Sequence, residues 1–520
     1  MPAHNLYTTF ARAFPADGAA PFIVEPGGGV VRYGEVDERS ASMAGALAGL
    51  GVARGDRVVV QLPKSPTAVL LYLACLRHGA VYVPFNPSYT VVETASLIAD
   101  ADPALVITTP LRASELRASS IPVPVAVVDD DGSGDVVDRS GPATGAAQPI
   151  SPDDVAAILY TSGTTGHPKG AMLTHRNLLA NAEVLHAAWA WEPGDVLLHV
   201  LPLFHAHGLF VAMHTALLNG SKVILVPRFD AAQVVELLPQ ATVLMAVPTQ
   251  YVRLLAQRGF DEAACRRIRL LTSGSAPLAA PTWEAVAART GHQIVERYGT
   301  SETLMIASNP YHGDRVPGTV GFPLPGVEAR VVDEGGSEVP AATMGLLEVH
   351  SASVFAGYHR APEATARAMR PGGWFHTGDL ATVDTSGRVT IRGRARDVVI
   401  SAGVNISPRE VEEVLERVGG VAESAVVGVP HPDLGEALVA VVVPRADELP
   451  TAEGMAEAWG SSLARFKHPK AVVLAVALPR NTMGKIEKAT LRHTLAEVFS
   501  GGHLPQGWRF LSQPPDTVPP

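Results

Sequence analysis

Residues 155–170 have the sequence VAAILYTSGTTGHPKG, an apolar run that passes directly into a glycine-rich turn. The apolar part, 155–160, predicts a strand buried in a sheet that helices cover. The turn, 161–170, contains three glycines, four hydroxyl side chains and one lysine. Small residues let a ligand approach the backbone, and N–H groups, hydroxyls and a cation bind phosphate oxygens. The stretch therefore predicts a phosphate-binding loop, with a helix beginning near His175.

The residues assigned to phosphate are those of the turn that carry a hydroxyl, a cation or a flexible backbone. They are Thr161, Ser162, Gly163, Thr164, Thr165, Gly166 and Lys169. The alternative is an ordinary solvated turn, which rarely concentrates so many of these groups after a buried strand. The spacing does not match G-x-x-x-x-G-K-[ST], so the pattern disfavours a kinase or GTPase of that class.

Outward from the turn, apolar runs alternate with helical stretches from about residue 40 to residue 310. Helices are expected at 68–76 and 92–101. Strands are expected at 58–62, 81–83, 155–160, 196–201, 223–226, 242–247, 268–272 and 293–297. This alternation predicts α/β architecture, with mostly parallel sheets covered by helices and ligands bound at the carboxyl ends of the strands.

The composition and the predicted secondary structure of the chain change twice after this region. From 318 to 394 short strands and Gly/Pro turns predict a small β-rich subdomain. Beyond it a further unit begins, with a helix at 408–417 and strands at 425–428 and 438–443. Residues 127–150 and the tail 501–520, rich in Gly and Pro, are expected to be irregular.

Composition narrows the class of function. The 520 residues are 47% hydrophobic and 18% charged, with a net charge of −10 and no long basic block. This balance disfavours nucleic acid or an anionic membrane as a partner. Two cysteines cannot form a disulfide framework or a cysteine-rich zinc site. The sequence suggests neither a signal peptide nor a membrane span, so a cytoplasmic location is expected.

Six further motifs occur downstream of the turn. They are LPLFHAHGL (201–209), SGSAP (273–277), ERYGTSET (296–303), WFHTGD (374–379), GRARD (393–397) and PRNTMGKIEK (479–488). With these motifs in this order, nearly the whole chain resembles the AMP-forming acyl-CoA synthetases of the adenylating-enzyme superfamily. The resemblance implies an enzyme that uses ATP and Mg²⁺ to convert a small carboxylic acid to an acyl-adenylate, with CoA as co-substrate.

The resemblance also implies the domain organisation. A large N-terminal domain, 1–394, would bind acid and ATP with two parallel-type αβ subdomains and the β-rich subdomain. A smaller, mobile α+β domain would span 395–500, followed by the irregular tail 501–520. GRARD would contain the hinge, with Arg396 where the family usually has Asp or Lys.

The nucleotide site follows from the same resemblance. Attack of a carboxylate on a phosphate brings negative charges together, so the site must supply cations and fixed geometry. Glu302 would hold Mg²⁺, Asp379 would accept both ribose hydroxyls, and Arg394 would be the second ribose contact. The remaining nucleotide contacts would be Ser275, Ala276 and Pro277 beside adenine, together with Tyr298, Gly299 and Ser301, a serine where the family usually has threonine.

Two reactions would share this site. Lys485 would stabilise the transition state of adenylation, and we favour it over the nearby Lys488 because it follows a glycine. Rotation of the C-terminal domain would then replace Lys485 with the thiol of CoA. Ala402 and Gly403 would line the thiol path. The family commonly has two glycines there, so a methyl group at Ala402 narrows that path.

Three residues bear on the acid. His207 is expected beside the acyl pocket. Arg253 and Arg297 occupy positions that many relatives fill with uncharged residues, and two guanidinium groups would suit a second carboxylate. Several stretches resemble the malonyl-CoA synthetases, which implies malonate or methylmalonate as the acid. Another dicarboxylate, an aromatic acid, a carrier protein as acceptor and a non-catalytic nucleotide-binding paralogue remain open alternatives.

Overall fold

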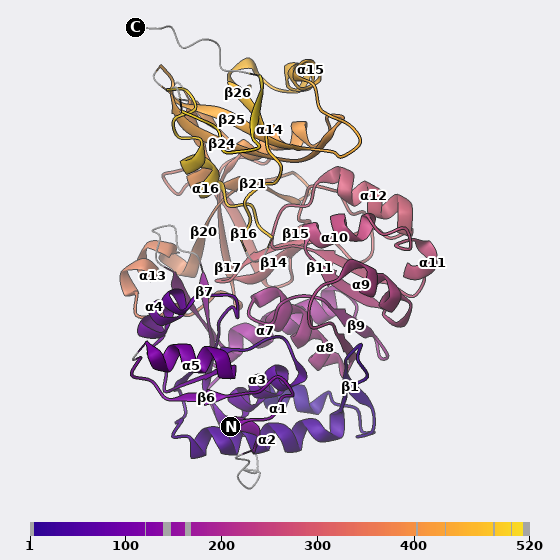
Figure 1. The fold of residues 1–520 in the computed structure, drawn as a ribbon, viewed down its shortest axis with the longest axis vertical. Helices are drawn as coiled ribbons and strands as arrows, with labels where there is room; N and C mark the ends of the chain where they lie inside the picture. The colour runs from indigo at the N-terminus through magenta and orange to yellow at the C-terminus, as the bar shows by residue number, and fades with distance from the viewer. Residues whose placement is uncertain are drawn as a thin grey trace.

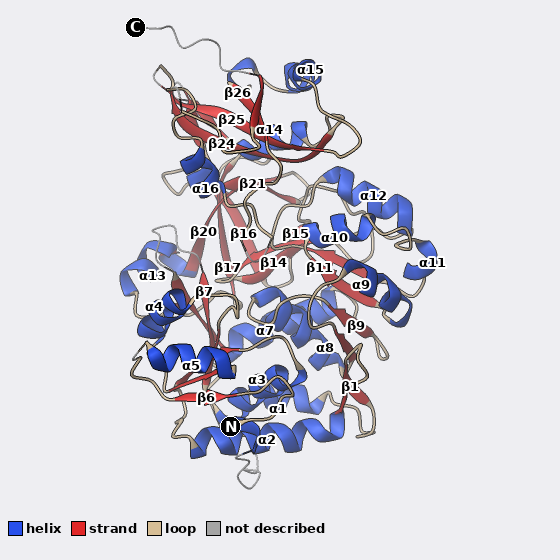
Figure 2. Ribbon diagram, in the orientation of Figure 1, coloured by secondary structure: helices blue, strands red, loops and turns tan. Residues whose placement is uncertain are grey.

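The computed structural model describes residues 5–119, 121–138, 147–161, 168–401, 404–431, 433–481, 484–500 and 502–512. Within these residues the strands form four sheets. Figure 2 shows helices packed around the sheets of the larger part, and Figure 1 shows the C-terminal sheet as a separate layer at one end of the molecule. The predicted α/β fold class, with a large N-terminal and a smaller C-terminal domain, is confirmed.

A seven-stranded sheet contains the strand that leads into the glycine-rich turn. Its strands in spatial order are β18 (Gly357–Tyr358), β8 (Lys169–Thr174), β7 (Val155–Thr161), β4 (Val81–Pro84), β3 (Arg57–Gln61), β5 (Leu105–Thr108) and β6 (Val125–Val127). From β7 to β6 all pairs are parallel, and β8 and β18 add antiparallel pairs. Four helices accompany it, α2 (Tyr33–Gly49), α3 (Pro66–His78), α4 (Val91–Ala101) and α5 (Pro110–Ala118).

Local sequence explains where the buried helix α3 begins and ends. Ser65 caps it by accepting from the backbone N–H of Ala68, and proline stands at the first helical position, which lacks a backbone partner in any case. Gly79 ends the helix in a left-handed conformation with φ of 78°. The helix is nearly all apolar between these signals, and it packs against α2 within the main core.

A nine-stranded sheet forms the second large layer. Its strands in spatial order are β15 (Phe322–Pro323), β14 (Leu304–Ser308), β13 (Val295–Thr300), β12 (Leu270–Ser273), β11 (Val243–Ala246), β9 (Val196–His199), β10 (Lys222–Leu225), β1 (Pro21–Val24) and β2 (Val30–Arg32). The central pairs from β13 to β1 are parallel, and antiparallel pairs occur only at the two edges.

Helices cover both faces of this sheet. One face contributes to the core shared with the seven-stranded sheet, and a second core lies under α9 to α12 (Figure 1). The helical segments are α1 (Leu6–Arg12), α7 (His175–Ala188), η1 (His207–Met213), α8 (His214–Asn219), α9 (Ala231–Leu237), η2 (Leu238–Gln240), α10 (Pro248–Leu255), α11 (Glu262–Cys265) and α12 (Ala280–Thr290).

The predicted β-rich subdomain is a five-stranded antiparallel sheet. It contains β16 (Val327–Val332), β17 (Gly345–Ser351), β19 (Met369–Arg370), β20 (Trp374–Val383) and β21 (Val389–Arg394), with α13 (Pro362–Ala368) and η3 (Pro371–Gly373) alongside. In the ladder between β20 and β21, Asp379 lies opposite Arg394. Two predicted ribose contacts are therefore brought together by strand register.

The C-terminal part is a six-stranded sheet with a core on each face. Its strands are β22 (Val399–Ser401), β23 (Val404–Ile406), β24 (Val421–His431), β25 (Gly435–Pro444), β26 (Ala471–Leu474) and β27 (Arg509–Ser512). Its helical segments are η4 (Ala395–Asp397), α14 (Pro408–Leu415), α15 (Ala452–Ser462), η5 (Arg465–Lys467) and α16 (Lys488–Thr494). Long runs of Val and Ala in β24 and β25 explain why this sheet is buried on both faces.

Three segments differ from the sequence expectations. The glycine-rich turn leads into β8, antiparallel to β7, and only then into α7, because KGAMLT can pair along its full length with the preceding strand. Asp135–Asp138 forms the short helix α6 within a segment expected to be a loop. Part of the tail forms β27, because Phe510 packs into one C-terminal core and Leu511 into the other. The limits of the predicted domains stay predictions.

None of the helices among the described residues is long and apolar enough to cross a membrane.

Candidate active site

Four neighbouring strands of the nine-stranded sheet end at one edge, where their carboxyl ends meet. Residues predicted to bind the acid and the adenine follow these strands. His207 comes after β9, Arg253 lies on α10 after β11, Ser275 follows β12, and Arg297 lies on β13. Topology therefore gathers residues that are up to 90 positions apart (207 to 297) at one sheet edge.

Arg297 is a buried cation that no carboxylate neutralises among the residues the structure describes. It is 3% exposed. Its Nη1 donates to Sδ of Met305 at 3.0 Å, while Nε and Nη2 have no hydrogen-bond partner. Burial lowers the pKa of Arg297 to about 9, so the guanidinium is still charged at neutral pH. Such a group needs an anion to compensate its charge.

The neighbouring Glu296 does not supply that anion. Successive side chains on a strand point to opposite faces, and Glu296 Oε1 accepts from the backbone N–H of Gly318 at 2.9 Å. Burial raises the pKa of Glu296 to about 8. The charge of Arg297 is therefore directed away from the one acidic side chain adjacent to it in sequence.

Gly274 leaves space for the guanidinium group of Arg297. A Cβ atom at Gly274 would lie only 2.5 Å from Cζ of Arg297, closer than real Cβ contacts allow. The guanidinium therefore lies directly against the backbone of the loop that follows β12. Any side chain at position 274 would displace it.

His207 begins η1, a π-helix, a wider turn often found at functional sites. The next residue must be glycine, since a Cβ at Gly208 would overlap the carbonyl oxygen of Pro202. Nδ1 of His207 lies 3.2 Å from Oγ of Ser275, whose φ of 70° is uncommon outside glycine. Burial, with Arg297 nearby, lowers the pKa of His207 well below its usual value, so the imidazole is neutral.

A second buried side chain near Arg297 has a polar atom without a hydrogen-bond partner within the described part of the chain. It is Nε2 of His207, whose pKa the charge of Arg297 helps to lower. Buried polar groups in proteins are nearly always hydrogen-bonded. The unsatisfied atoms of Arg297 and His207 together indicate a site for a polar, anionic ligand.

Arg253 does not share this burial. Its side chain is exposed on α10, one helical turn after Thr249, so the two residues lie on the same face of the helix. That face meets the C-terminal domain, because a Cβ at Gly484 would lie 2.9 Å from Oγ1 of Thr249. Arg253 is thus at the boundary with the C-terminal domain, while Arg297 lies in the interior.

The two predicted ribose residues form a compact ion pair. Asp379 is 3% exposed, its Oδ1 lies 2.9 Å from Nε of Arg394, and its Oδ2 accepts from the hydroxyl of Tyr298. Arg394 also donates to the carbonyl of Thr377 at 3.2 Å. Burial raises the pKa of Asp379, and Arg394 and Tyr298 counter that effect. Carboxylate oxygens have further lone pairs, so Asp379 can still accept from two hydroxyl groups.

Glu302 and Lys169, far apart in sequence, meet through Tyr358. The hydroxyl of Tyr358 donates to Oε1 of Glu302 at 2.9 Å. Nζ of Lys169 lies over the ring of the same tyrosine, 5.4 Å from its centroid. Thr161, opposite Lys169 in the ladder, marks where the glycine-rich turn leaves the sheet.

Lys485 approaches the same group of residues from the C-terminal domain. Its charge and that of Glu302 both act on Asp379. The turn that carries Lys485 is closed by Asn481, which accepts from the backbone N–H of Lys485 at 3.0 Å, and its Gly484 has φ of 73°. Gly484 packs on Thr249, so the domains meet at the lysine turn. The structure thus brings Lys485, Glu302 and Asp379 together.

The donor set fits a magnesium ion carried by a nucleotide. Across the described ranges there is no group of three or more His, Cys, Asp or Glu that could hold a metal ion by itself. Mg²⁺ is commonly bound by one or two carboxylates together with substrate phosphates and water. The half-buried carboxylate of Glu302 suits that arrangement.

Comparison with known proteins agrees with this geometry. Residues 9–359 match the model of the AMP-binding enzyme family, and residues 410–485 match that of the AMP-binding enzyme C-terminal domain. The chain belongs to the AMP-binding enzyme family. Asp379 and Arg394 of this AMP-binding enzyme lie between the two matched segments, outside both of them. The ion pair described above is therefore evidence for their pairing that does not depend on the family match.

Three similar proteins span most of the chain. ATP-bound MatB from Rhodopseudomonas palustris is 43% identical, with a TM-score of 0.92, and the match covers 96% of this chain and 100% of that one. Malonate–CoA ligase ACSF3 of Mus musculus is 34% identical over 91% of this chain and 88% of its own length. Feruloyl-CoA synthase of an Amycolatopsis species is 35% identical over 90% and 95%.

Some predicted residues lie outside the described part of this AMP-binding enzyme. They are Ser162, Gly163, Thr164, Thr165, Gly166, Ala402 and Gly403, and for Arg396 only the backbone, within η4, is described. Ala276 and Pro277 follow Ser275 in the loop after β12, Gly299 lies near the end of β13, and Ser301 lies in the turn between β13 and β14. The roles of all these residues stay predictions.

Sequence reasoning missed three residues of this site. Gly274, a residue of the SGSAP motif, leaves the space that Arg297 occupies. Thr249 receives the lysine turn, and Tyr358 joins Glu302 to Lys169. The only sequence signal for Tyr358 was the Gly–Tyr pair at 357–358. This pair indicates no function until the fold brings Tyr358 beside Glu302.

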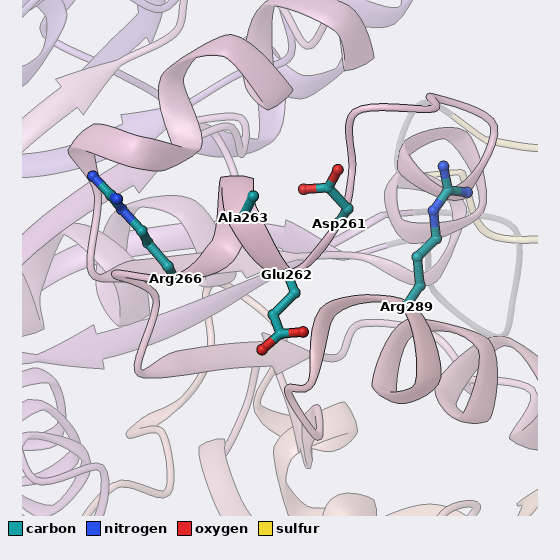
Figure 3. A pocket seen from close by; sticks show the side chains of 5 residues that line it. All are labelled: Asp261, Glu262, Ala263, Arg266 and Arg289. Atoms are coloured by element: carbon teal, nitrogen blue, oxygen red, sulfur yellow. The ribbon is translucent and has the colours of Figure 1, made fainter.

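A separate hollow of about 510 Å³ lies at the surface over α11 and α12. Figure 3 shows its lining side chains, which are Asp261, Glu262, Ala263, Arg266 and Arg289. Arg289 is satisfied by the carbonyls of Leu255 and Gln257. None of the predicted site residues lines this hollow.

Proposed function

We propose that this protein is an AMP-forming acid–CoA ligase that converts malonate, or the closely related methylmalonate, into its CoA thioester. ATP and CoA are consumed, and AMP and pyrophosphate are released. The observation that carries the choice of acid is the buried, uncompensated guanidinium of Arg297. The malonate–CoA ligases among its relatives support the same choice, although a feruloyl-CoA synthase is about as similar in sequence.

The charge of Arg297 distinguishes a dicarboxylate from a monocarboxylate. An acid with an apolar tail would leave the cation buried and unpaired, which costs several kcal/mol (about 3–5) when a buried pair lacks one member. The second carboxylate of malonate would accept from Nε and Nη2 of Arg297, and neutral His207 can donate from Nε2. Exposed Arg253 would add long-range attraction rather than a buried ion pair.

Adenylation is the first half-reaction. One carboxylate oxygen of malonate attacks the α-phosphorus of ATP, a new C–O–P linkage forms, and the bond to pyrophosphate breaks. We assign the phosphates to Lys169 and the turn 161–166, and the stabilisation of the added charge to Lys485. When bound, Mg²⁺ supplies positive charge to the phosphate oxygens, and Glu302 is the residue that would hold it.

We assign the adenine and ribose of ATP to the remaining residues of the site. Asp379 would accept the ribose hydroxyls while Arg394 keeps it ionised. The loop of Ser275, Ala276 and Pro277 would lie beside adenine, with Tyr298, Gly299 and Ser301 completing the pocket. The ion pair between Asp379 and Arg394 supports this assignment, since it is formed before any nucleotide binds.

Thioester formation is the second half-reaction. The sulfur of CoA loses its proton and attacks the carbonyl carbon of the adenylate, and AMP leaves. Lys485 must make way for the thiol, and we assign this movement to rotation of the C-terminal domain at Arg396. Ala402 and Gly403 would border the thiol path. A carrier-protein thiol could follow the same chemistry, and the assay below distinguishes it from CoA.

We also propose that the enzyme works in the reducing cytoplasm. Its two cysteines, Cys75 and Cys265, are both buried free thiols, as is usual for proteins of that compartment.

The test is pyrophosphate release with a panel of acids that isolates the second carboxylate. Propionate is the matched control, because it replaces one carboxylate of malonate with a methyl group, and ferulate and benzoate represent aromatic acids. We expect malonate to exceed propionate by about 10²-fold in kcat/KM, as for loss of a buried ion pair. Equal or better use of propionate or ferulate would reject the proposed acid. Mass spectrometry of the products should show malonyl-CoA when CoA is present, and its absence would favour a carrier as acceptor.

A further inference from the structure

Tyr358 lies where the two charged groups assigned to the triphosphate end of ATP come together. It comes from β18, Lys169 from β8, and Glu302 from the turn after β13, so three distant segments meet at one aromatic ring. The hydroxyl donates to Oε1 of Glu302 at 2.9 Å, and the ring face lies under Nζ of Lys169 at 5.4 Å from the centroid. One side chain therefore contacts an anion through its edge and a cation through its face.

The backbone holds this ring firmly. Tyr358 pairs with Ala171 of β8, and the flanking residues Ala356 and His359 donate to the carbonyls of Met172 and Gly170. Its own N–H donates to Oγ1 of Thr365 at 2.8 Å. Pairing along β8 keeps the ring in register with Lys169, because both residues belong to adjoining strands of the same sheet.

We propose that Tyr358 is a positioning residue that orients the carboxylate of Glu302 toward the magnesium of bound ATP and seats Lys169 over its ring. This inference rests on the proposed function, because it assumes that ATP binds with its phosphates near Lys169 and Glu302. A phenol is donor and acceptor, whereas an ionised carboxylate only accepts, so the hydrogen bond occupies one lone pair of Oε1 and fixes the rotamer of Glu302. Because the rotamer of Glu302 is fixed, the direction in which its second oxygen, Oε2, points is fixed as well.

The two functions of Tyr358 separate by substitution. Tyr358→Phe keeps the ring under Lys169 and removes the hydrogen bond to Glu302. Tyr358→Leu removes both the hydrogen bond and the aromatic face. A matched control is Tyr33→Phe, which removes a buried tyrosine hydrogen bond, to the carbonyl of Ser221 at 2.8 Å, outside the site.

The experiment measures binding without turnover. The Kd of ATP is determined by calorimetry with Mg²⁺ and with EDTA, in the absence of any carboxylic acid, and their ratio reports how strongly the metal tightens ATP. We expect Tyr358→Phe to reduce this ratio by about tenfold, since hydrogen bonds to charged groups are among the stronger ones. Its Kd in EDTA should stay at the wild-type value, whereas Tyr358→Leu should weaken binding in EDTA as well. Tyr33→Phe should match the wild type in both.

A wild-type ratio in Tyr358→Phe would overturn the inference. If both Kd values are unchanged, the hydrogen bond has no effect on ATP binding; if both are weakened equally, Tyr358 has a purely structural role. Circular dichroism and thermal unfolding of each variant confirm that the protein compared is folded. Failure of the proposed function looks different, since the wild-type enzyme would then bind ATP with a normal magnesium ratio yet release no pyrophosphate with malonate.

Discussion

Asp379 and Arg297 are both 3% exposed and are assigned to opposite ends of the proposed reaction, but their surroundings differ. Asp379 is neutralised within the protein by Arg394 and bonded to the hydroxyl of Tyr298. Arg297 has a single sulfur contact, to Met305, and two nitrogens without partners in the described structure. The proposed nucleotide end is therefore electrostatically complete without a ligand, whereas the proposed acid end would be complete only with an anion present.

This difference has a consequence for stability. A neutralised buried charge contributes to the folded state, and removing one member of the pair destabilises it. An uncompensated buried charge opposes folding, so its removal should cost nothing or increase stability. Substitutions at the two ends should therefore impair activity in both cases but change the free energy of unfolding in opposite directions.

The largest expected effect on activity comes from substitution of Lys485, which we assign to neither the nucleotide end nor the acid end. Lys485→Ala should lower adenylation by about 10²–10³-fold, as is usual when a preorganised group that stabilises transition-state charge is removed. Thioester formation from supplied malonyl-adenylate should persist. Pyrophosphate release and thioester formation are measured separately. The control is Lys488→Ala, because Lys488 forms an ion pair with Glu412 at 2.6 Å within the C-terminal domain; loss of both half-reactions in Lys485→Ala would contradict the division of labour.

Arg297→Met tests the acid end directly. We expect kcat/KM for malonate to fall by about 10²-fold while the Kd of ATP changes less than about twofold, because the cation would pair with the second carboxylate alone. The free energy of unfolding should stay equal or rise. Arg253→Met, at an exposed position, should cost only about fivefold. Weakened ATP binding in Arg297→Met would show that Arg297 has a structural role instead.

Asp379→Asn tests the nucleotide end. ATP should bind about tenfold more weakly, since a charged acceptor for the ribose hydroxyls is replaced by an amide. The free energy of unfolding should fall by about 2 kcal/mol, less than for a fully buried pair because Arg394 is 33% exposed and can be hydrated. Urea denaturation of this variant and of Arg297→Met measures the two signs side by side. A change of the same sign in the free energy of unfolding of both variants would contradict the proposed difference between the two ends.

Gly274→Ala should have a smaller effect, confined to the acid. The added methyl would meet Cζ of Arg297 at 2.5 Å, so the guanidinium must move away from the loop. We expect the KM for malonate to rise about tenfold, as for partial loss of a charged hydrogen bond, with KM for ATP unchanged. A substantial rise in the KM for ATP would mean that the adenine loop, rather than Arg297, responds to the substitution.

The smallest effect on activity is expected from pH. Burial lowers the pKa of His207 well below that of the unfolded chain, so it is neutral throughout the pH range 6–8 and kcat/KM for malonate should show no inflection from it. Stability behaves differently. The unfolded histidine gains a proton below its ordinary pKa of about 6.5, whereas the folded one does not, so stability is lost as pH falls through that value. Thermal unfolding between pH 8 and 5 measures this loss, and His207→Asn should diminish it.

Much of the fold was predictable because its strands are apolar runs between turns. The predicted strand at 155–160 and helix at 68–76 correspond to β7 and α3 to within a few residues. The strand β8 was missed because Gly170 and Lys169 make its start look like a loop, and pairing with β7 overrides that composition. The strand β27 was missed because its two partly buried apolar side chains stand in a segment rich in Pro and Gly.

The site was less predictable, since burial depends on distant segments. Arg253 and Arg297 looked equivalent in sequence, yet one is exposed and the other buried. The difference arises because β13 runs inside the sheet while α10 lies on its surface. Tyr358 could not be assigned at all, because 56 residues separate it from Glu302 and only the pairing of β18 with β8 brings the two together.

Arg394 is also the last residue of β21, and η4, which contains the proposed pivot, begins at the next position. Just before it, Arg392 is held to the C-terminal domain through a hydrogen bond from Ser407 to its carbonyl at 2.5 Å. On the proposed mechanism, departure of AMP would remove the ribose from the very arginine that adjoins the pivot, while its ion pair with Asp379 stays formed. Product loss and the return of Lys485 would then be a single event, and the catalytic cycle would need no separate signal to begin again.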